Sequence, residues 1–185
     1  VCIRSSTNTY NQTLLASIIE HEGEEAATDW AEGVVANFAR APQGGDTDQL
    51  RGLVSGECGI AVSNSYYFAR AVRREVEGVS EALDTIGWVF PNQDGRGAHM
   101  NLSGGGVAAH APNRDAAVAF LEYLASDQAQ EYFSAGNDEY PVVDGVPVAE
   151  SVAYLGTFEA DEVDLSDVAD NIPTAQEIFN TVGWP

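Results

Sequence analysis

Lysine is absent from this 185-residue sequence, and all eight basic residues are arginines. Against them stand 29 aspartates and glutamates, which gives a formal net charge of −21 at pH 7. A surface this acidic disfavours nucleic acids and anionic membranes as partners, because they carry the same sign of charge. An acidic surplus without lysine is typical of a halophilic-type surface, whose self-repulsion is screened in high salt.

Long apolar runs are also lacking. No stretch approaches the roughly 20 apolar residues that cross a bilayer, so no membrane span is expected. No basic-then-apolar leader is present, so the chain itself contains no predicted signal peptide. The sequence opens inside a segment that is typical of a strand, Val1-Cys2-Ile3, and we therefore expect further sequence upstream of it.

Cysteine is scarce, with only Cys2 and Cys58, which are 56 positions apart. A structural metal site needs a closer cluster of Cys and His than this. Each cysteine lies in a short β-like segment, so one interpretation is a disulfide between neighbouring strands in an oxidising compartment. Such a bond would stabilise the fold by about 4 kcal/mol through chain entropy. Two buried free thiols are the alternative.

Strand-like and helix-like segments alternate in the first half of the chain. Strands are predicted at residues 1–4, 58–63, 86–90, 98–103 and 107–110. Helices are predicted at about residues 10–22, 24–40, 46–56, 66–76, 113–125, 126–135 and 149–155, with a last one opening at Thr174. The first helix is expected to end at Gly23. The alternation predicts an α/β fold with a mainly parallel sheet.

Two adjacent tyrosines, Tyr66 and Tyr67, follow the predicted strand 58–63 and open a predicted helix. In the first turn of a helix, neighbouring side chains point about 100° apart and can converge on one object. The C-terminal end of a strand is also where open α/β sheets place their ligands. Two phenol oxygens suit a hard, highly charged cation. Ring packing in the core is the alternative, and the dipeptide alone favours it.

Several polar motifs resemble, in order along nearly the whole chain, those of the ferric-iron-binding substrate-binding proteins of bacterial ABC importers. The motifs are Arg4–Gln12 (RSSTNTYNQ), Ala36–Arg40 (ANFAR), Gln43–Gln49 (QGGDTDQ), Asn64–Tyr67 (NSYY), Phe90–Gly97 (FPNQDGRG) and Glu139–Val142 (EYPV). The resemblance implies an α/β fold like that of type II periplasmic binding proteins, a three-layer lobe with a mainly parallel mixed sheet.

The same resemblance implies how the chain is divided. Residues 1–95 are expected to form most of the C-terminal, iron-binding lobe. Residues 96–185 are expected to contain the hinge crossover and C-terminal helices that pack largely on an N-terminal lobe missing from this sequence.

The resemblance also implies the iron ligands. Fe³⁺ would be held in the cleft by the phenolates of Tyr10, Tyr66 and Tyr67, with the remaining ligands in the missing part. Arg70, one helical turn beyond the tyrosine pair, and Arg4 are expected beside these oxygens, where positive charge favours phenolates. Arg70 as a surface ion-pair partner is the alternative. Arg4 is also placed to meet a carbonate-like anion at the helix mouth.

The implied function is transport rather than catalysis. The protein would be periplasmic or anchored at the cell surface, monomeric at full length, and would deliver Fe³⁺ to an inner-membrane ABC permease. Three rivals remain open: a binding protein of the same fold for an oxyanion or a polyamine, a carboxylate-based hydrolase, and an inactive folded fragment.

Other residues indicate little chemistry. His21, His99 and His110 are dispersed and are interpreted as solvated. The acidic segment 159–170 lacks the D-x-D-x-D-G register of a calcium loop. The run Gly104–Gly106 lacks the Lys-Ser/Thr of a phosphate loop. No serine lies in a G-x-S-x-G motif.

Overall fold

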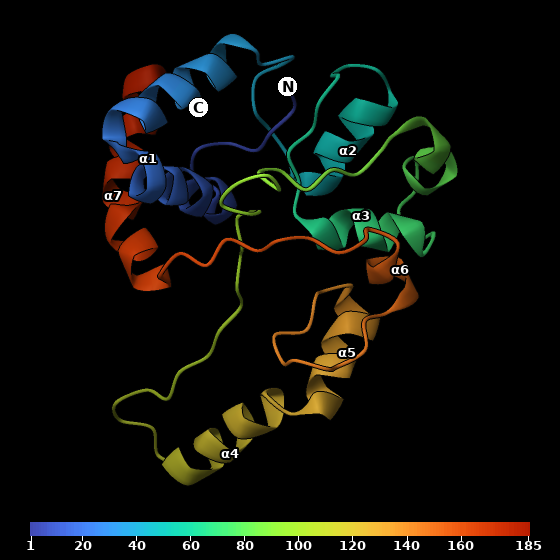
Figure 1. Cartoon of the computed structure of the whole chain (residues 1–185), viewed down its shortest axis with the longest axis vertical. Helices are drawn as coiled ribbons and strands as arrows, with labels where there is room; N and C mark the ends of the chain where they lie inside the picture. The colour runs from blue at the N-terminus through green and yellow to red at the C-terminus, as the bar shows by residue number, and fades with distance from the viewer.

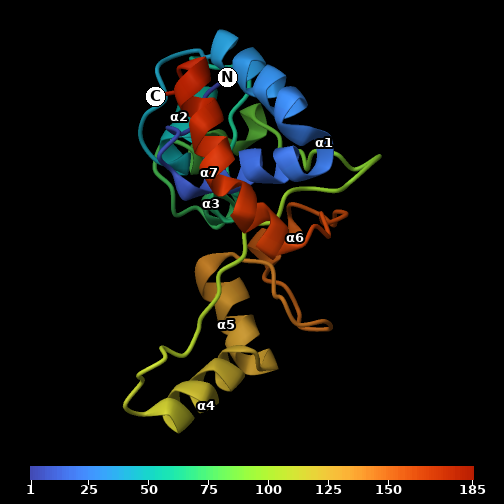
Figure 2. The ribbon, with the colours of Figure 1, turned by 90° about the vertical axis from the view of Figure 1, so that its left-hand side faces the viewer.

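The computed structural model describes residues 1–185, and helices dominate it. The helices are α1 (Thr9–Ala36), α2 (Asp46–Val54), α3 (Ser65–Val72), the 3₁₀ helix η1 (Ser80–Thr85), α4 (Arg114–Leu124), α5 (Asp127–Asn137), α6 (Glu150–Ala153) and α7 (Leu165–Val182). In both views the α4–α5 pair projects from the body that the other helices form (Figure 1, Figure 2). None of the helices combines the length and the apolar character needed to cross a membrane.

The predicted sheet is wrong in extent. In place of five strands the structure has two isolated parallel bridges, which join Cys2 to Ala61 and Ala98 to Ala160. At the first bridge the Cys2 amide donates to the Ile60 carbonyl at 2.8 Å, and the Cys2 carbonyl accepts from the Val62 amide at 3.0 Å. A ladder extends only where both segments keep exchanging hydrogen bonds. The predicted strands 86–90 and 107–110 pair with no other segment.

A glycine divides α1 into two helical parts, where the sequence predicts a helix end. Gly23 has φ +84° and ψ 167°, a conformation that glycine adopts without the steric cost of a Cβ. The chain therefore changes direction at this residue and resumes its helix at once. The two parts of α1 run in different directions, and both views show α1 beside α7 (Figure 1, Figure 2).

The first hydrophobic core lies between α1 and α7. Leu15, Ile18 and Ile19 of α1 are buried against Ile178 and Phe179 of α7. These side chains recur at the three-to-four-residue spacing of an amphipathic helix, which is why the sequence predicts both apolar stripes. This core holds the helix that carries Tyr10.

The last helix begins earlier than predicted. The sequence favours a capping box at Thr174, but α7 begins at Leu165, with the Asp164 side chain accepting from the Ser166 amide at 2.8 Å. Asp164 supplies the cap that the first turn needs, and residues 165–170 of the acidic segment are therefore helical. Pro173 lies inside the helix and removes one backbone donor from it.

The second hydrophobic core lies beneath α3. Phe68 and Ala69 of α3 pack with Leu50 of α2, with Val79, and with Val152 of α6, and all five are buried. The face of α3 that carries Phe68 is thereby fixed, and the first turn of the helix is left at the surface of this core. That turn carries Tyr66 and Tyr67.

Helix α4 has no buried residue. The apolar residues of this helix favour a buried face, yet Phe120 is 59% exposed, and Ala117, Leu121 and Leu124 are only half-buried. The division of the chain at residues 95 and 96 remains a prediction.

Candidate functional site

Tyr10, Tyr66 and Tyr67 lie in the first turns of two helices. Tyr10 is the second residue of α1, and its amide donates to Oδ1 of the N-cap residue Asn8 at 3.0 Å. Tyr66 and Tyr67 are the second and third residues of α3, whose N-cap residue is Asn64. The side-chain cap of Asn8 fixes where α1 begins, whereas Asn64 accepts from the Tyr67 amide through its backbone carbonyl at 3.3 Å.

The three phenols, which we call the tyrosine cluster, come together in the structure. The Tyr10 and Tyr66 hydroxyl oxygens are 2.9 Å apart, within hydrogen-bond distance. The rings of Tyr66 and Tyr67 lie 4.2 Å apart between centroids, with their planes inclined by 31°. All three side chains are half-buried, so the oxygens are neither scattered nor sealed inside the core.

Burial raises the pKa of Tyr66 well above that of a free phenol, and its hydrogen bonds to Tyr10 and Tyr67 raise it further. A phenolate at this position would be poorly solvated and would lose a hydrogen bond that it donates as a phenol. The cluster is therefore held together by protons shared between phenols. A cation that replaced those protons would remove both penalties at once.

Arg4 lies over the Tyr10 ring, with its guanidinium carbon 5.1 Å from the ring centroid. Its Nη1 donates to Asp46 Oδ1 at 3.0 Å. Burial works to lower the pKa of Arg4, but the hydrogen bond and charge of Asp46, together with Tyr67, raise it overall. Arg4 is therefore a fixed positive charge beside the tyrosine cluster.

Arg70 faces the other two rings. Its guanidinium carbon is 5.8 Å from the centroid of Tyr66 and 5.9 Å from that of Tyr67. Its Nε is 3.9 Å from Oδ2 of Asp138, a fully buried carboxylate on the far side. Arg70 thus lies over the rings and pairs with a buried rather than a surface carboxylate, and its role beside the phenol oxygens stays a prediction.

Cys2 and Cys58 form a disulfide bond, and no free cysteine is left. Cys2 is also the residue of the first parallel bridge, opposite Ala61. The segment before α1 and the segment before α3 are therefore joined covalently and by backbone hydrogen bonds. Each of these segments leads to one part of the tyrosine cluster.

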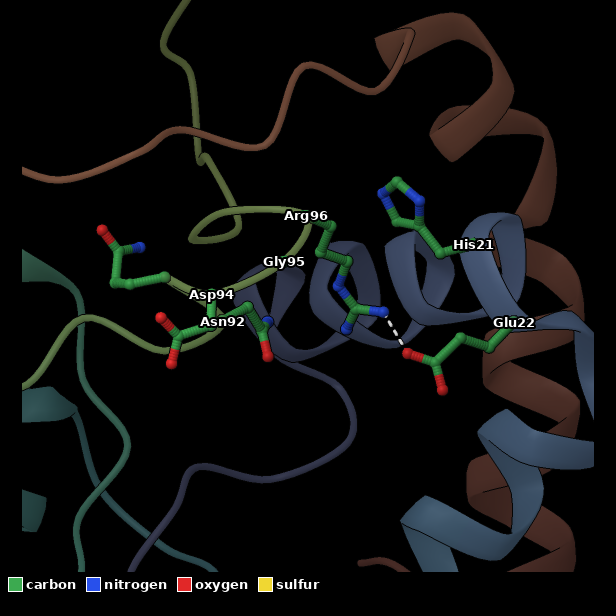
Figure 3. A pocket seen from close by; sticks show the side chains of 7 residues that line it. His21, Glu22, Asn92, Asp94, Gly95 and Arg96 are labelled. Carbon is green, nitrogen blue, oxygen red and sulfur yellow. Dashed lines mark hydrogen bonds and ion pairs between the residues drawn. The ribbon is translucent and has the colours of Figure 1, made fainter.

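Two hollows lie near these elements. A groove of about 1330 Å³ includes Tyr10 and Tyr66 in its lining, together with many apolar side chains. A separate pocket of about 560 Å³ has no hydrophobic lining residue and is formed by His21, Glu22 and residues 92–96. Figure 3 shows Arg96 reaching across this pocket to pair with Glu22. The polar pocket contains none of the three tyrosines.

Of the three histidines predicted to be solvated, His110 is exposed, whereas His21 is hydrogen-bonded to Asp161 and His99 is half-buried. His21 Nε2 lies 2.9 Å from both carboxylate oxygens of Asp161. Burial lowers the pKa of His99, although the nearby Asp161 charge opposes this. Nowhere in the chain do three or more His, Cys, Asp or Glu side chains gather in a way that could hold a metal ion.

Sequence reasoning missed a set of polar residues that connect the two helix mouths. Asp46 accepts hydrogen bonds from both mouths, and Asn101 bridges Thr13 Oγ1 and Asn64 Oδ1 at 2.8 Å each. Asp46 stands in the QGGDTDQ motif, at the start of the predicted helix 46–56. The signal available was its place inside a motif, since nothing in the pattern shows that its carboxylate is buried.

Comparison with known proteins places the chain among binding proteins for solutes. Residues 4–162 match the family described as bacterial extracellular solute-binding protein. Iron uptake protein A1 of Synechocystis sp. is 45% identical over 184 residues, which cover 100% of this chain and 51% of that protein. The chain therefore spans about half the length of the curated relatives it matches.

Solved structures agree with this placement. A Trichodesmium protein in complex with iron and citrate ligands superposes with a TM-score of 0.93 at 46% identity, covering 100% of this chain and 59% of the other. The apo form of a Synechocystis protein, FutA2, gives a TM-score of 0.94 at 44% identity, again covering 100% of this chain and 59% of the other. The fold is thus the one found in these binding proteins.

Proposed function

This chain belongs to the family of bacterial extracellular solute-binding proteins, and we propose that its solute is ferric iron, bound by Tyr10, Tyr66 and Tyr67. The observation that carries the proposal is the 2.9 Å separation of the Tyr10 and Tyr66 hydroxyl oxygens, with the tilted Tyr67 ring 4.2 Å from the Tyr66 ring between centroids. Oxygens from two separate helix mouths meet at one point. Phenolate oxygens suit a hard, trivalent cation. The relatives named for iron support the same choice.

Binding exchanges protons for the metal ion. A free phenol ionises near pH 10, so an ion that binds to phenolates at neutral pH must displace phenol protons. Three phenolates together neutralise the charge of Fe³⁺. Arg4 and Arg70 then stabilise the phenolates from outside, at ring distances of 5.1 Å and 5.8–5.9 Å. This is electrostatic positioning, and the proposal includes no catalytic step.

An anion completes the proposed site. Arg4 lies at the N-terminal end of α1, where backbone amides and the helix dipole favour negative charge. A carbonate-like or carboxylate anion at this point would add oxygens to the ion and pair with the guanidinium. The citrate in the Trichodesmium complex supports a carboxylate in this role.

The wider role follows from the proposed cargo. We place the protein in the periplasm or at the cell surface, where it passes Fe³⁺ to an inner-membrane ABC permease and acts as a monomer. Residues 1–95 would form most of one iron-binding lobe. Residues 96–185 would contain the hinge crossover and helices whose uncovered faces, such as that of α4, pack on a second lobe.

Iron titration of the chain tests the proposal. Adding Fe³⁺ as its nitrilotriacetate complex is expected to produce a visible phenolate-to-iron charge-transfer band, whereas phosphate or a polyamine produces none. Tyr10→Phe and Tyr66→Phe are each expected to weaken binding by more than about 100-fold, because even residues outside the ligand set cost 10–100-fold. Tyr132→Phe is the matched control, since Tyr132 is 64% exposed on α5. An absent band, or a band unchanged by Tyr66→Phe, rejects the proposal.

A further inference from the structure

Asp46 is a buried carboxylate that receives hydrogen bonds from two directions. The residue is 2% exposed, at the first position of α2. Its Oδ1 accepts from Arg4 Nη1 at 3.0 Å. Its Oδ2 accepts from the Asn64 backbone amide at 2.7 Å, from Asn64 Nδ2 at 3.2 Å and from Ser63 Oγ at 3.4 Å. Each oxygen therefore serves a different segment of the chain.

The two segments that Asp46 contacts are those that lead into α1 and α3, the helices that carry the tyrosine cluster. Arg4 precedes α1, and its backbone carbonyl accepts from Asn11 Nδ2 at 2.7 Å, next to Tyr10. Asn64 is the N-cap of α3 and stands two residues before Tyr66. Through one carboxylate, the start of α1 is connected to the start of α3.

Asn101 also connects the two helices, through Thr13 of α1 and Asn64, while the other connections lie closer to the start of the chain. The disulfide of Cys2 with Cys58 and the bridge of Cys2 with Ala61 hold the segments where they run side by side. Beyond that point the segments lead into separate helices, and Asp46 connects them again at the helix mouths. The Tyr10 and Tyr66 oxygens, 2.9 Å apart, lie beyond this second connection.

We propose that Asp46 is a positioning residue, which sets the separation of the Tyr10 and Tyr66 oxygens for one shared cation. The inference rests on the proposed function and assigns a determinant to that site. Asp46 acts through Arg4 and Asn64 and does not itself touch the ion. Because Asp46 lies between the N-terminal ends of α1 and α3, it affects the spacing of the metal ligands as well as the stability of the fold.

The carboxylate is chemically required for this role, because every group that faces it is a donor. An amide at the same position would present an NH₂ group on one side. Whichever oxygen it replaced, a donor would then meet the donors of Arg4 or those of Asn64. One of the two connections must break, and the buried group left behind loses its partner. Asp46→Asn therefore separates the helix mouths with almost no change in side-chain volume.

The matched control is Asp48→Asn, on the same helix. The Asp48 side chain is 47% exposed, and its Oδ2 accepts from the Gly45 amide at 2.8 Å, a bond that an asparagine oxygen keeps. With Fe³⁺ supplied as its nitrilotriacetate complex, Asp46→Asn is expected to weaken binding 10- to 100-fold, the range for residues that orient metal ligands. Asp48→Asn is expected to stay within about twofold of the unchanged chain.

A double-mutant cycle separates positioning from a general loss of stability. If Asp46 acts by placing Tyr10, then Asp46→Asn should cost much less in the Tyr10→Phe background, where that oxygen is already gone. A purely structural role predicts the same loss in both backgrounds. Asp46→Glu keeps the charge but lengthens the side chain, and the same cycle applies to it should Asp46→Asn fail to fold.

The outcomes are distinguishable. No charge-transfer band with the unchanged chain overturns the proposed function itself. A band with the unchanged chain together with full affinity in Asp46→Asn, or with equal losses in the two backgrounds, overturns the positioning role and leaves the proposed function standing. A loss that nearly vanishes in the Tyr10→Phe background supports both.

Discussion

Acidification is expected to release iron from this chain steeply, and the tyrosine cluster sets how steeply. A free phenol ionises near pH 10, so an ion that binds to phenolates at neutral pH must displace their protons. Burial, and hydrogen bonds to Tyr10 and Tyr67, raise the pKa of Tyr66 further. In the complex all three would be phenolates. Three protons should therefore leave for each ion bound, throughout the range below the phenol pKa values.

The size of the effect follows from that count. One proton released per ion changes the apparent association constant tenfold per pH unit, which is about 1.4 kcal/mol. Three protons give about 1000-fold, or about 4 kcal/mol, for each unit of pH. Affinity rises with pH, since the proton-free phenols are the binding form.

Two measurements check this value. An indicator dye in weakly buffered solution reports the protons released when ferric nitrilotriacetate is added, with the protons taken up by the chelator measured in a blank. Competition with the same chelator between about pH 5 and 8 gives the slope. Tyr10→Phe and Tyr66→Phe should each release two protons, and Tyr132→Phe should still release three. Release of one proton or none, or an unchanged value in Tyr66→Phe, would refute the shared-phenolate reasoning.

Three further predictions concern stability and are measured by urea unfolding. Replacing both Cys2 and Cys58 by serine should cost about 4 kcal/mol, and reductant should destabilise the unchanged chain but not the variant. Burial lowers the pKa of His99, so as the pH drops the imidazole is protonated in the unfolded chain before it is protonated in the folded one. The free energy of unfolding should therefore fall as the pH drops below about 6.5. His99→Gln should flatten that fall, and an identical pH profile in this variant would contradict the burial argument. Phe179→Ala should cost about 3–5 kcal/mol, since Phe179 is fully buried between α1 and α7; a loss under about 1 kcal/mol would contradict that packing.

Local signals in the sequence predict the helices well. The break in α1 falls at Gly23, and Ser126 caps α5 by accepting from the Ala129 amide. These features depend on neighbouring residues only, so a sequence pattern contains all the information they need. The last helix is one exception, because Asp164 and Thr174 are both good caps and only packing decides between them. The other is η1, Ser80–Thr85, which is not among the predicted helices.

The strands show the opposite case. Residues 86–90 have the apolar content of a strand, but a strand exists only with a hydrogen-bonding neighbour, and none pairs with it. The apolar stripe of α4 likewise predicts burial, while Phe120 remains 59% exposed. The sequence pattern of a segment shows whether it could be buried or could pair as a strand. Whether it does so depends on a partner segment from elsewhere in the fold.

The candidate site divides in the same way. The helix mouths place Tyr66 and Tyr67 together from sequence alone, whereas Tyr10 joins them only through the resemblance and the fold. Asp46 could not be predicted, because its burial depends on Arg4 and Asn64, which approach it from distant parts of the chain. Iron binding by these residues remains a prediction.

The disulfide closes residues 2–58 into a covalent loop, which affects what happens when a protease cleaves the chain. A single nick in the exposed stretch around Gly44 would open the backbone without separating the pieces, because the sulfur bridge still tethers them. Tyr10 lies inside the ring and Tyr66 a few residues past it, so both halves of the cluster would stay on one molecule. Only a reductant would then set the fragment carrying Tyr10 free from the one carrying Tyr66.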